Sequence, residues 1–332
     1  MSNCPVPKRV DIGGQAVMEG VMMKGPDAIA VAVRRPNGTI VVKRDTYTPP
    51  SKKHKWMGYP FFRGIIGMGS MLSLGMKTLQ LSSNMLGIMD EEPSKFEKWL
   101  SKKLGKGIDK IIMGTAAVLA IVLAIGLFFV LPALVGSFLR QHFESKVVIN
   151  LLEGLTRILI LIGYMIFCGT IPDVRRTFQY HGAEHKTVYC HENNLPLTPE
   201  NASKFSALHP RCGTTFLLIV FVLAILLYTI AGYNGANYIL RVLSRLALLP
   251  IVAGLSYEIL KGLAHANGKL VNALRWPGLM MQKLTTRTPD DKMLEVAIAA
   301  MNAALYGLPE GEETKDGYTI VGAAPKAEAA QA

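Results

Sequence analysis

Four long apolar runs constrain what this chain of 332 residues can fold into more than any other feature. The runs are residues 111–138, 147–171, 214–231 and 237–263. Each has at least 18 residues, and a helix of about 17–25 residues can cross a bilayer core of about 30 Å. Half of the residues are hydrophobic and the mean hydropathy is +0.28, which is high for a soluble protein. The sequence therefore predicts an α-helical polytopic membrane protein with four transmembrane helices.

The distribution of positive charge predicts the orientation of these helices. The formal net charge is +12, but the basic residues flank the apolar runs and form no aromatic-and-basic motif of an RNA-binding module. We therefore expect membrane lipids, and no nucleic acid, around the chain. Lysine and arginine gather before the first run, between the second and third, and after the fourth. Because such segments stay inside, we expect a multi-pass protein of the bacterial cytoplasmic membrane with both termini in the cytoplasm.

The N-terminal segment is more polar than the apolar runs. Residues 1–59 predict a small α+β cytoplasmic unit that contains a β-hairpin. Segments 28–33 and 39–42 have the composition of strands, and they flank Asn37-Gly38, a pair typical of tight hairpin turns. Since residues 1–59 have no apolar run that spans a membrane, we expect the unit to be soluble.

The remaining segments complete the predicted organisation around the membrane domain, residues 111–263. Residues 60–110 predict a glycine-rich interfacial helix and a charged amphipathic helix, although the glycine-rich part could instead cover the soluble unit. Residues 264–309 predict a cytoplasmic helical segment whose apolar face, including Leu294 and Met301, packs on the N-terminal unit. Residues 310–332 have a composition typical of disorder.

Charged residues inside the apolar runs are the first candidates for special roles. Glu153 and Arg157 lie in the second run, four residues apart, and Arg241 and Arg245 lie at a similar depth in the fourth. Charges in a bilayer are costly unless they are paired. An intrahelical Glu153–Arg157 pair is the simplest interpretation. The similar depth also predicts an ion-pair network that joins the second and fourth helices.

The segment between the second and third runs, residues 172–213, is a predicted cytoplasmic loop rich in metal-type ligands. It holds four of the seven histidines and two of the four cysteines. If the sequence around His181 is helical, His181 and His185 lie one turn apart on the same face. With Glu184 they form H-x-x-E-H, the inverzincin order, in which the histidines bind zinc and the glutamate acts on water. Glu184 is therefore the candidate catalytic base.

A second ligand pair, His209 and Cys212, closes the same segment. Nitrogen and sulfur donors together suit zinc among divalent metals. Four protein ligands would fill a tetrahedral shell, which favours a structural ion, whereas three would leave a position for catalysis. A polar loop whose histidines bond only to backbone or water is the alternative. Additional candidates for the site are Glu258 and His265 near the end of the fourth run, and Glu19 in the N-terminal unit.

Four motifs together resemble the YqhQ-like family of bacterial membrane proteins. They are GGQAVMEGVMMKGP, FQYHGAEHKTVYC, HPRCGT and QKLTTRTPDDKMLEVAIAA, at residues 13–26, 178–190, 209–214 and 282–300. The family is described as predicted metal-dependent enzymes, so the resemblance implies this membrane architecture and a metal site. It implies no substrate.

Three functions are consistent with this sequence. The first is a membrane-embedded metal-dependent hydrolase with a zinc-type site at the cytoplasmic surface. The second is a membrane scaffold or transport-associated protein whose metal is purely structural. The third is a transporter or scaffold whose histidines bind nothing, and four spans with few polar residues would then have to form a homo-oligomer. The coordination number separates the first two, because a catalytic ion keeps an open position.

Overall fold

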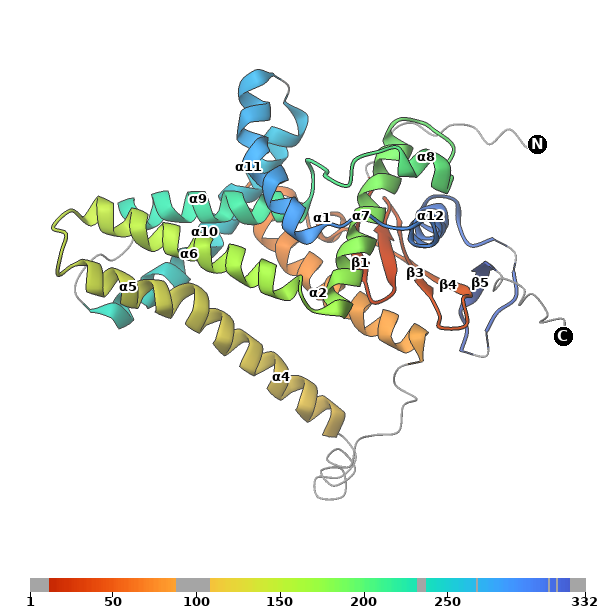
Figure 1. Ribbon diagram of the computed structural model, residues 1–332, viewed down its shortest axis with the longest axis horizontal. Coiled ribbons are helices and arrows are strands. Elements are labelled where there is room, and N and C mark those ends of the chain that lie inside the picture. Colours follow the sequence, from red (N-terminus) through yellow and green to blue (C-terminus); the bar gives the residue numbers. More distant parts are fainter. Residues whose placement is uncertain are drawn as a thin grey trace.

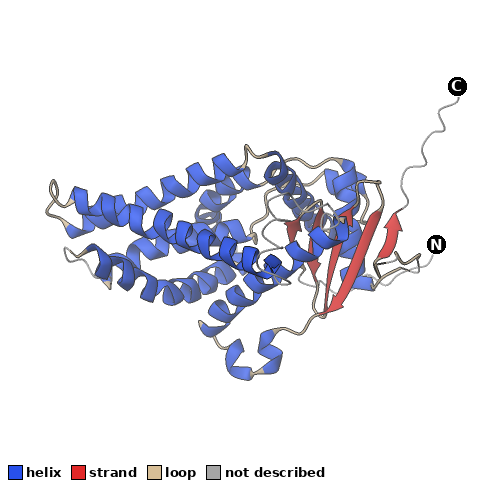
Figure 2. Ribbon diagram, turned by 90° about the horizontal axis from the view of Figure 1, so that it is seen from below, coloured by secondary structure: helices blue, strands red, loops and turns tan. Residues whose placement is uncertain are grey.

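The computed structural model describes residues 12–87, 108–231, 237–266, 268–309, 311–314 and 316–322. An elongated bundle of helices forms one end of the molecule, and a twisted sheet flanked by helices forms the other (Figures 1 and 2). Helix α7 and the start of α9 lie where the two parts meet (Figure 1). The described chain is thus mostly helical, with one small antiparallel sheet.

The sheet has five antiparallel strands in the order in which they occur along the chain. They are β1 Gly13–Val17, β2 Gly20–Lys24, β3 Ala28–Arg34, β4 Ile40–Thr46 and β5 Thr319–Gly322. The hairpin predicted around Asn37-Gly38 is confirmed, with Arg34 opposite Ile40 and Gly38 at a φ of 86°. That positive φ is the conformation that a tight hairpin turn requires and that glycine adopts without strain.

Three of these strands lie where the sequence pattern does not indicate them. Strands β1 and β2 come from the glycine- and methionine-rich segment before the hairpin. In β2, Met22 packs into one core and Met23 into the opposite one, so the strand is apolar on both faces and shows no alternation. Strand β5 corrects the expectation that residues 310–332 are disordered, because residues 319–322 pair with the edge of β4.

Helices cover both faces of the sheet. On one face, α12 (Asp291–Tyr306) packs through Leu294 and Met301 against residues such as Met23, which confirms the predicted contact with the N-terminal unit. On the other face lies α2 (Phe62–Leu86), which packs through Met85 and its neighbours. The N-terminal half of α2 packs on α10 instead, since a Cβ at Gly64 would lie 2.7 Å from Tyr257 Cβ. Helix α2 therefore covers the soluble unit and also reaches the bundle.

The helices of the bundle correspond to the predicted spans. The elements are α4 Ile108–Ile125, a π-helical stretch Gly126–Val130, α5 Leu131–Leu139, α6 Lys146–Cys168, α9 Gly213–Ile230 and α10 Tyr238–His265. Within the described residues they provide four stretches long and apolar enough to cross a membrane: Ala117–Leu139, Lys146–Cys168, Gly213–Ile230 and Ile239–Leu263. The amphipathic helix expected before the first of them falls largely on residues 88–107, outside the described residues.

The remaining helices connect the bundle to the sheet. They are α1 Pro50–Lys53, the 3-10 turn Lys55–Gly58, α7 Pro172–Glu192, α8 Pro199–Ser203 and α11 Lys269–Thr285. The predicted loop 172–213 is therefore largely helical. Helix α7 begins at Pro172, whose missing N–H is not needed in a first turn, with Asp173 beside it at the positive end of the helix dipole.

The ion-pair network predicted inside the apolar helices is also confirmed. Glu153 of α6 contacts Arg157 of the same helix at 3.6 Å and Arg241 of α10 at 3.1 Å. It also forms an ion pair with Arg245 of α10. All four side chains are buried, so the network joins the two helices inside the bundle.

Candidate metal centre

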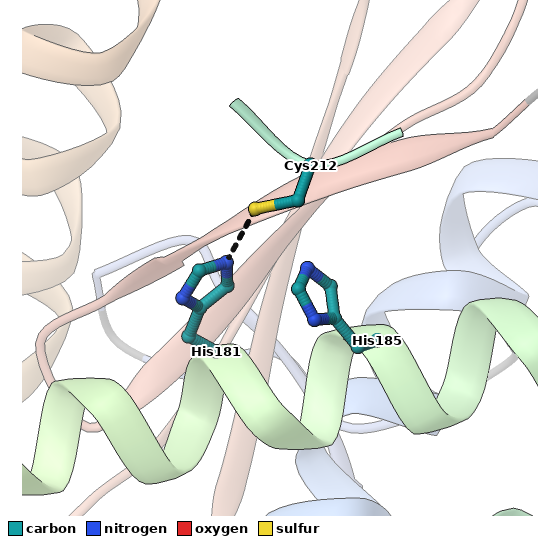
Figure 3. A group of neighbouring side chains, drawn as sticks. All are labelled: His181, His185 and Cys212. Carbon is teal, nitrogen blue, oxygen red and sulfur yellow. Dashed lines mark hydrogen bonds between the residues drawn. The ribbon is translucent and has the colours of Figure 1, made fainter. Parts of the chain in front are cut away.

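His181 and His185 lie one turn apart on α7, and their side chains point toward Cys212 (Figure 3). The two ring centroids are 4.4 Å apart. Cys212 precedes α9 and caps its first turn, with Sγ accepting a hydrogen bond from Thr214 N at 3.4 Å. One ligand atom from each of the three residues lies within 4.8 Å of the other two. The helical spacing read from the sequence thus brings both histidines to a sulfur from the start of the next helix.

Backbone carbonyls fix both imidazole rings. His181 Nδ1 lies 2.8 Å from the carbonyl oxygen of Thr285, and His185 Nδ1 lies 2.5 Å from that of Ala207. A carbonyl only accepts, so each Nδ1 carries a proton, and Nε2 is the ring nitrogen that could bind a metal. Metal-binding histidines in proteins are usually oriented in this way by a second partner.

One pair of donor atoms has a separation close to the one that a shared zinc ion would require. Typical Zn–N and Zn–S bonds at a tetrahedral angle separate the nitrogen and the sulfur by about 3.5 Å. In the structure, His181 Nε2 and Cys212 Sγ are 3.3 Å apart. His185 and Cys212 are buried, and His181 is half-buried. Two imidazoles and one sulfur in this arrangement could hold a divalent ion with one position left open.

Glu184 lies beside the three donors and is held from the other side by the sheet. Its Oε1 accepts a hydrogen bond from Gly14 N of β1 at 2.9 Å, and its Oε2 lies 3.4 Å from His185 Nε2. A Cβ at position 14 would lie 3.0 Å from Glu184 Cγ and 2.3 Å from the carbonyl oxygen of Met22. Glycine at this position therefore lets the strand approach the carboxylate closely. Nothing in the sequence pattern points to this contact.

His209, the fourth ligand expected from the sequence, does not belong to the group of three. Its ring lies 5.7 Å from that of His185, and its Nε2 contacts the two carboxylate oxygens of Glu192 at 3.3 and 3.4 Å. Its Nδ1 accepts a hydrogen bond from Arg211 N. Burial lowers the pKa of His209, so the ring is neutral near pH 7. The sequence suggested four ligands in a tetrahedral set. The structure brings three donors together and places His209 beside them.

Glu19 and Glu258 also lie outside the group of three, and each is engaged by an arginine. Glu19, in the turn between β1 and β2, forms a two-pronged pair with Arg176 of α7, with both N–O distances at 2.5 Å. Glu258 pairs with Arg63 of α2 at 2.8 and 2.5 Å. Two parallel charge-assisted hydrogen bonds hold a carboxylate more strongly than a neutral contact would. His265 ends α10, and its side chain lies outside the described part of the structure.

Helix α11 holds the Cys212 turn in place from the bundle side. The buried side chain of Gln282 accepts from His209 N at 2.8 Å and donates to His209 O at 2.7 Å. It also donates to Thr215 Oγ1 of α9 at 3.0 Å. Thr285, whose carbonyl orients His181, lies one turn further along α11. The three donors are therefore fixed by residues of α11, of the segment between α8 and α9, and of the first turn of α9.

His181, His185 and Cys212 lie within a region shared with known proteins. The family described as "Protein of unknown function (DUF1385)" matches residues 59–306. The chain belongs to this family. A Bacillus subtilis (strain 168) protein called "Uncharacterized protein YqhQ" is 34% identical over 299 residues, covering 88% of this chain and 92% of the relative. The resemblance to the YqhQ-like family is thereby confirmed. No solved structure matches the chain.

Proposed function

We propose that this DUF1385 protein is a membrane-embedded metal-dependent hydrolase with a zinc site at the cytoplasmic surface of the bacterial membrane. The observation that carries the proposal is the set of three donors, His181, His185 and Cys212, with the Glu184 carboxylate beside them. Three protein ligands and an adjacent base are typical of catalytic zinc sites, whereas structural sites have four ligands.

The membrane placement is supported by the four apolar helices and by their charge bias. The segments rich in lysine and arginine precede the first span, connect the second to the third, and follow the fourth. The positive-inside rule then puts the sheet, α7 and both termini in the cytoplasm. In this placement the three donors lie on the cytoplasmic side, on α7, which follows the second span, and at the start of α9, which forms the third.

His181, His185 and Cys212 would hold the ion. When bound, zinc supplies a Lewis acid that lowers the pKa of water and polarises a carbonyl or phosphoryl oxygen. Glu184 would lie close to the ion, because its Oε2 is 3.4 Å from His185 Nε2, one of the donor atoms. Its other oxygen is held by Gly14 N, so the carboxylate keeps one orientation while it accepts a proton and returns it to a leaving group.

A structural metal in a membrane scaffold or transport-associated protein is the second candidate function. The observation that favours it is His209, a neutral and buried histidine whose ring lies 5.7 Å from that of His185. A rotation of His209 away from Glu192 toward the donors would supply a fourth ligand and close the coordination shell. Metal geometry in the purified protein separates the two functions: a water in the fourth position supports the hydrolase, and His209 there supports the scaffold.

The double variant His181→Ala/His185→Ala is expected to lose its metal entirely. The purified wild type should carry about one zinc per chain, and a single sulfur donor does not retain zinc. Metal content by inductively coupled plasma mass spectrometry is the measurement. The control is His191→Ala on the same helix, outside the group of three, which should keep its metal. A double variant with stoichiometric metal would show that these histidines are not the ligands.

Cysteine labelling tests the orientation. Cys190 is fully buried and is therefore a poor reporter, so we choose two exposed positions at opposite ends of the bundle. In intact cells, an impermeant thiol reagent is expected to label Glu144→Cys. It should label Glu200→Cys only after the cells are permeabilised. The unmodified chain gives the background. The reverse pattern would invert the proposed topology.

A further inference from the structure

The bundle contains a second cluster of charged residues, far along the helices from the metal centre. The buried arginine cluster consists of Arg157 on α6 and of Arg241 and Arg245 on α10, all gathered around Glu153. The four side chains are between 0 and 4% exposed. The cluster lies at the end of the bundle opposite the sheet, where α6 and α10 begin (Figure 1).

The charges in this cluster do not balance. Arginine stays protonated in proteins, so three guanidinium groups face a single carboxylate. The other contacts described for these arginines are with neutral groups. They are the carbonyl oxygens of Phe128 and Ala133, Ser137 Oγ, Asn150 Oδ1 and the ring of Tyr228. The described cluster therefore carries an excess of two positive charges inside an apolar bundle.

Some of the arginine N–H groups also lack acceptors. Within the described residues, buried Arg245 Nη1 has no hydrogen-bond partner, and buried Arg157 Nη2 has only a long contact of 3.6 Å with Glu153 Oε2. A buried charged donor without an acceptor is unfavourable, because it has lost water and gained nothing in return. These two groups mark positions at which an acceptor is needed.

The position of the arginines argues against a purely structural role. Arg241 and Arg245 lie about 5 and 10 Å from the start of α10, close enough to the helix end for their side chains to extend to water. They turn inward instead, with 0 and 1% of their surfaces exposed. In a cluster used only for packing, one arginine would be enough to neutralise Glu153. Three inward-facing guanidinium groups are typical of an anion site.

We propose that the buried arginine cluster binds an oxyanion of the phosphate class, either the headgroup phosphate of an anionic phospholipid or free inorganic phosphate. The planar guanidinium fork matches pairs of phosphate oxygens, and a phosphate would supply both the missing acceptors and the missing negative charge. In the membrane placement proposed above, the site lies on the side away from the cytoplasm. It is separate from the metal centre and does not depend on a metal.

Binding is tested on full-length protein purified in detergent and stripped of lipid. Native mass spectrometry and thermal unfolding are followed while inorganic phosphate, phosphatidylglycerol or uncharged diacylglycerol is added in parallel. We expect a phosphate-class ligand to bind and to raise the melting temperature, and diacylglycerol to have no effect. Binding of phosphatidylglycerol alone identifies the lipid headgroup as the source, and binding of inorganic phosphate identifies the free anion. If neither binds, the proposal is wrong.

Two variants locate the site. Arg245→Gln is expected to weaken binding at least about tenfold, the loss that follows when a charge-assisted hydrogen bond is removed. Lys146→Gln removes one exposed positive charge at the same end of the bundle and should bind like the wild type. Equal weakening in both variants would mean that the anion responds only to overall charge, and would contradict the proposal.

A third variant covers the case in which Arg245→Gln does not fold. Arg245→Lys keeps the charge but loses the planar pair of donors, so it is expected to fold and to bind more weakly than the wild type. Binding by Arg245→Lys at wild-type strength would show that the fork of Arg245 does not contact the ligand. That result would overturn the assignment of the site.

Discussion

The variant Glu184→Gln is expected to keep its metal and its fold and to lose function. Glutamine has nearly the shape of glutamate and can still accept the hydrogen bond from Gly14 N, so the contact with β1 is retained. An amide does not take a proton from water, and loss of a general base typically lowers a rate by about 10²- to 10⁴-fold. The measurements are metal content and complementation of a strain that lacks the gene.

Glu200→Gln provides the matched control. Glu200 is an exposed carboxylate on α8, in the same segment between the second and third spans, and it does not contact the three donors. It should complement fully. Full complementation by Glu184→Gln with metal bound would favour the structural ion over the hydrolase. Loss of the metal from Glu184→Gln would instead make Glu184 a ligand.

The features predicted correctly from the sequence depend on local patterns or on a strong energetic rule. An apolar run identifies a candidate span by its length alone, so the four helices of the bundle could be located without knowledge of their neighbours. Charges inside such runs must find partners, which made the pairing of Glu153 with arginines on α10 predictable. Helical spacing likewise places His181 and His185 together, because they are four residues apart.

The features that were missed depend on contacts between distant segments. From the sequence, Glu19, His209 and Glu258 were all plausible metal ligands. The tertiary fold determines which side chain each of them contacts instead. Arg176 of α7 engages Glu19, and Arg63 of α2 engages Glu258. Backbone groups such as Gly14 N and the carbonyl of Thr285 carry no side-chain signature at all. The number of donors at the metal centre was therefore not predictable from residue types alone.

Strands were missed for a related reason. An alternating pattern reveals a strand that is buried on one face only. Strand β2 is buried on both faces by α12 and α2, and its sequence Gly-Val-Met-Met-Lys shows no alternation. Strand β5 is four residues long and follows a segment of low apolar content, so only its pairing with β4 identifies it.

Removing the single carboxylate of the buried arginine cluster is expected to cause the largest loss of stability. Glu153→Gln keeps the size of the side chain but leaves three guanidinium groups without a negative partner. Removing one member of a buried ion pair typically costs about 3–5 kcal/mol. The expected result is a decrease of that size in the free energy of unfolding, measured by denaturant titration in mixed micelles.

Glu144→Gln is the matched control for this change. Glu144 is an exposed carboxylate in the turn before α6, at the same end of the bundle, and surface substitutions of this kind alter stability by less than about 0.5 kcal/mol. If the two variants are equally stable, the negative charge of Glu153 is not needed to stabilise the three arginines, and the prediction is wrong. Because the variant cluster has three positive charges and no carboxylate, phosphate should stabilise Glu153→Gln more than it stabilises the wild type. This larger response follows from the same charge imbalance that indicates an anion site.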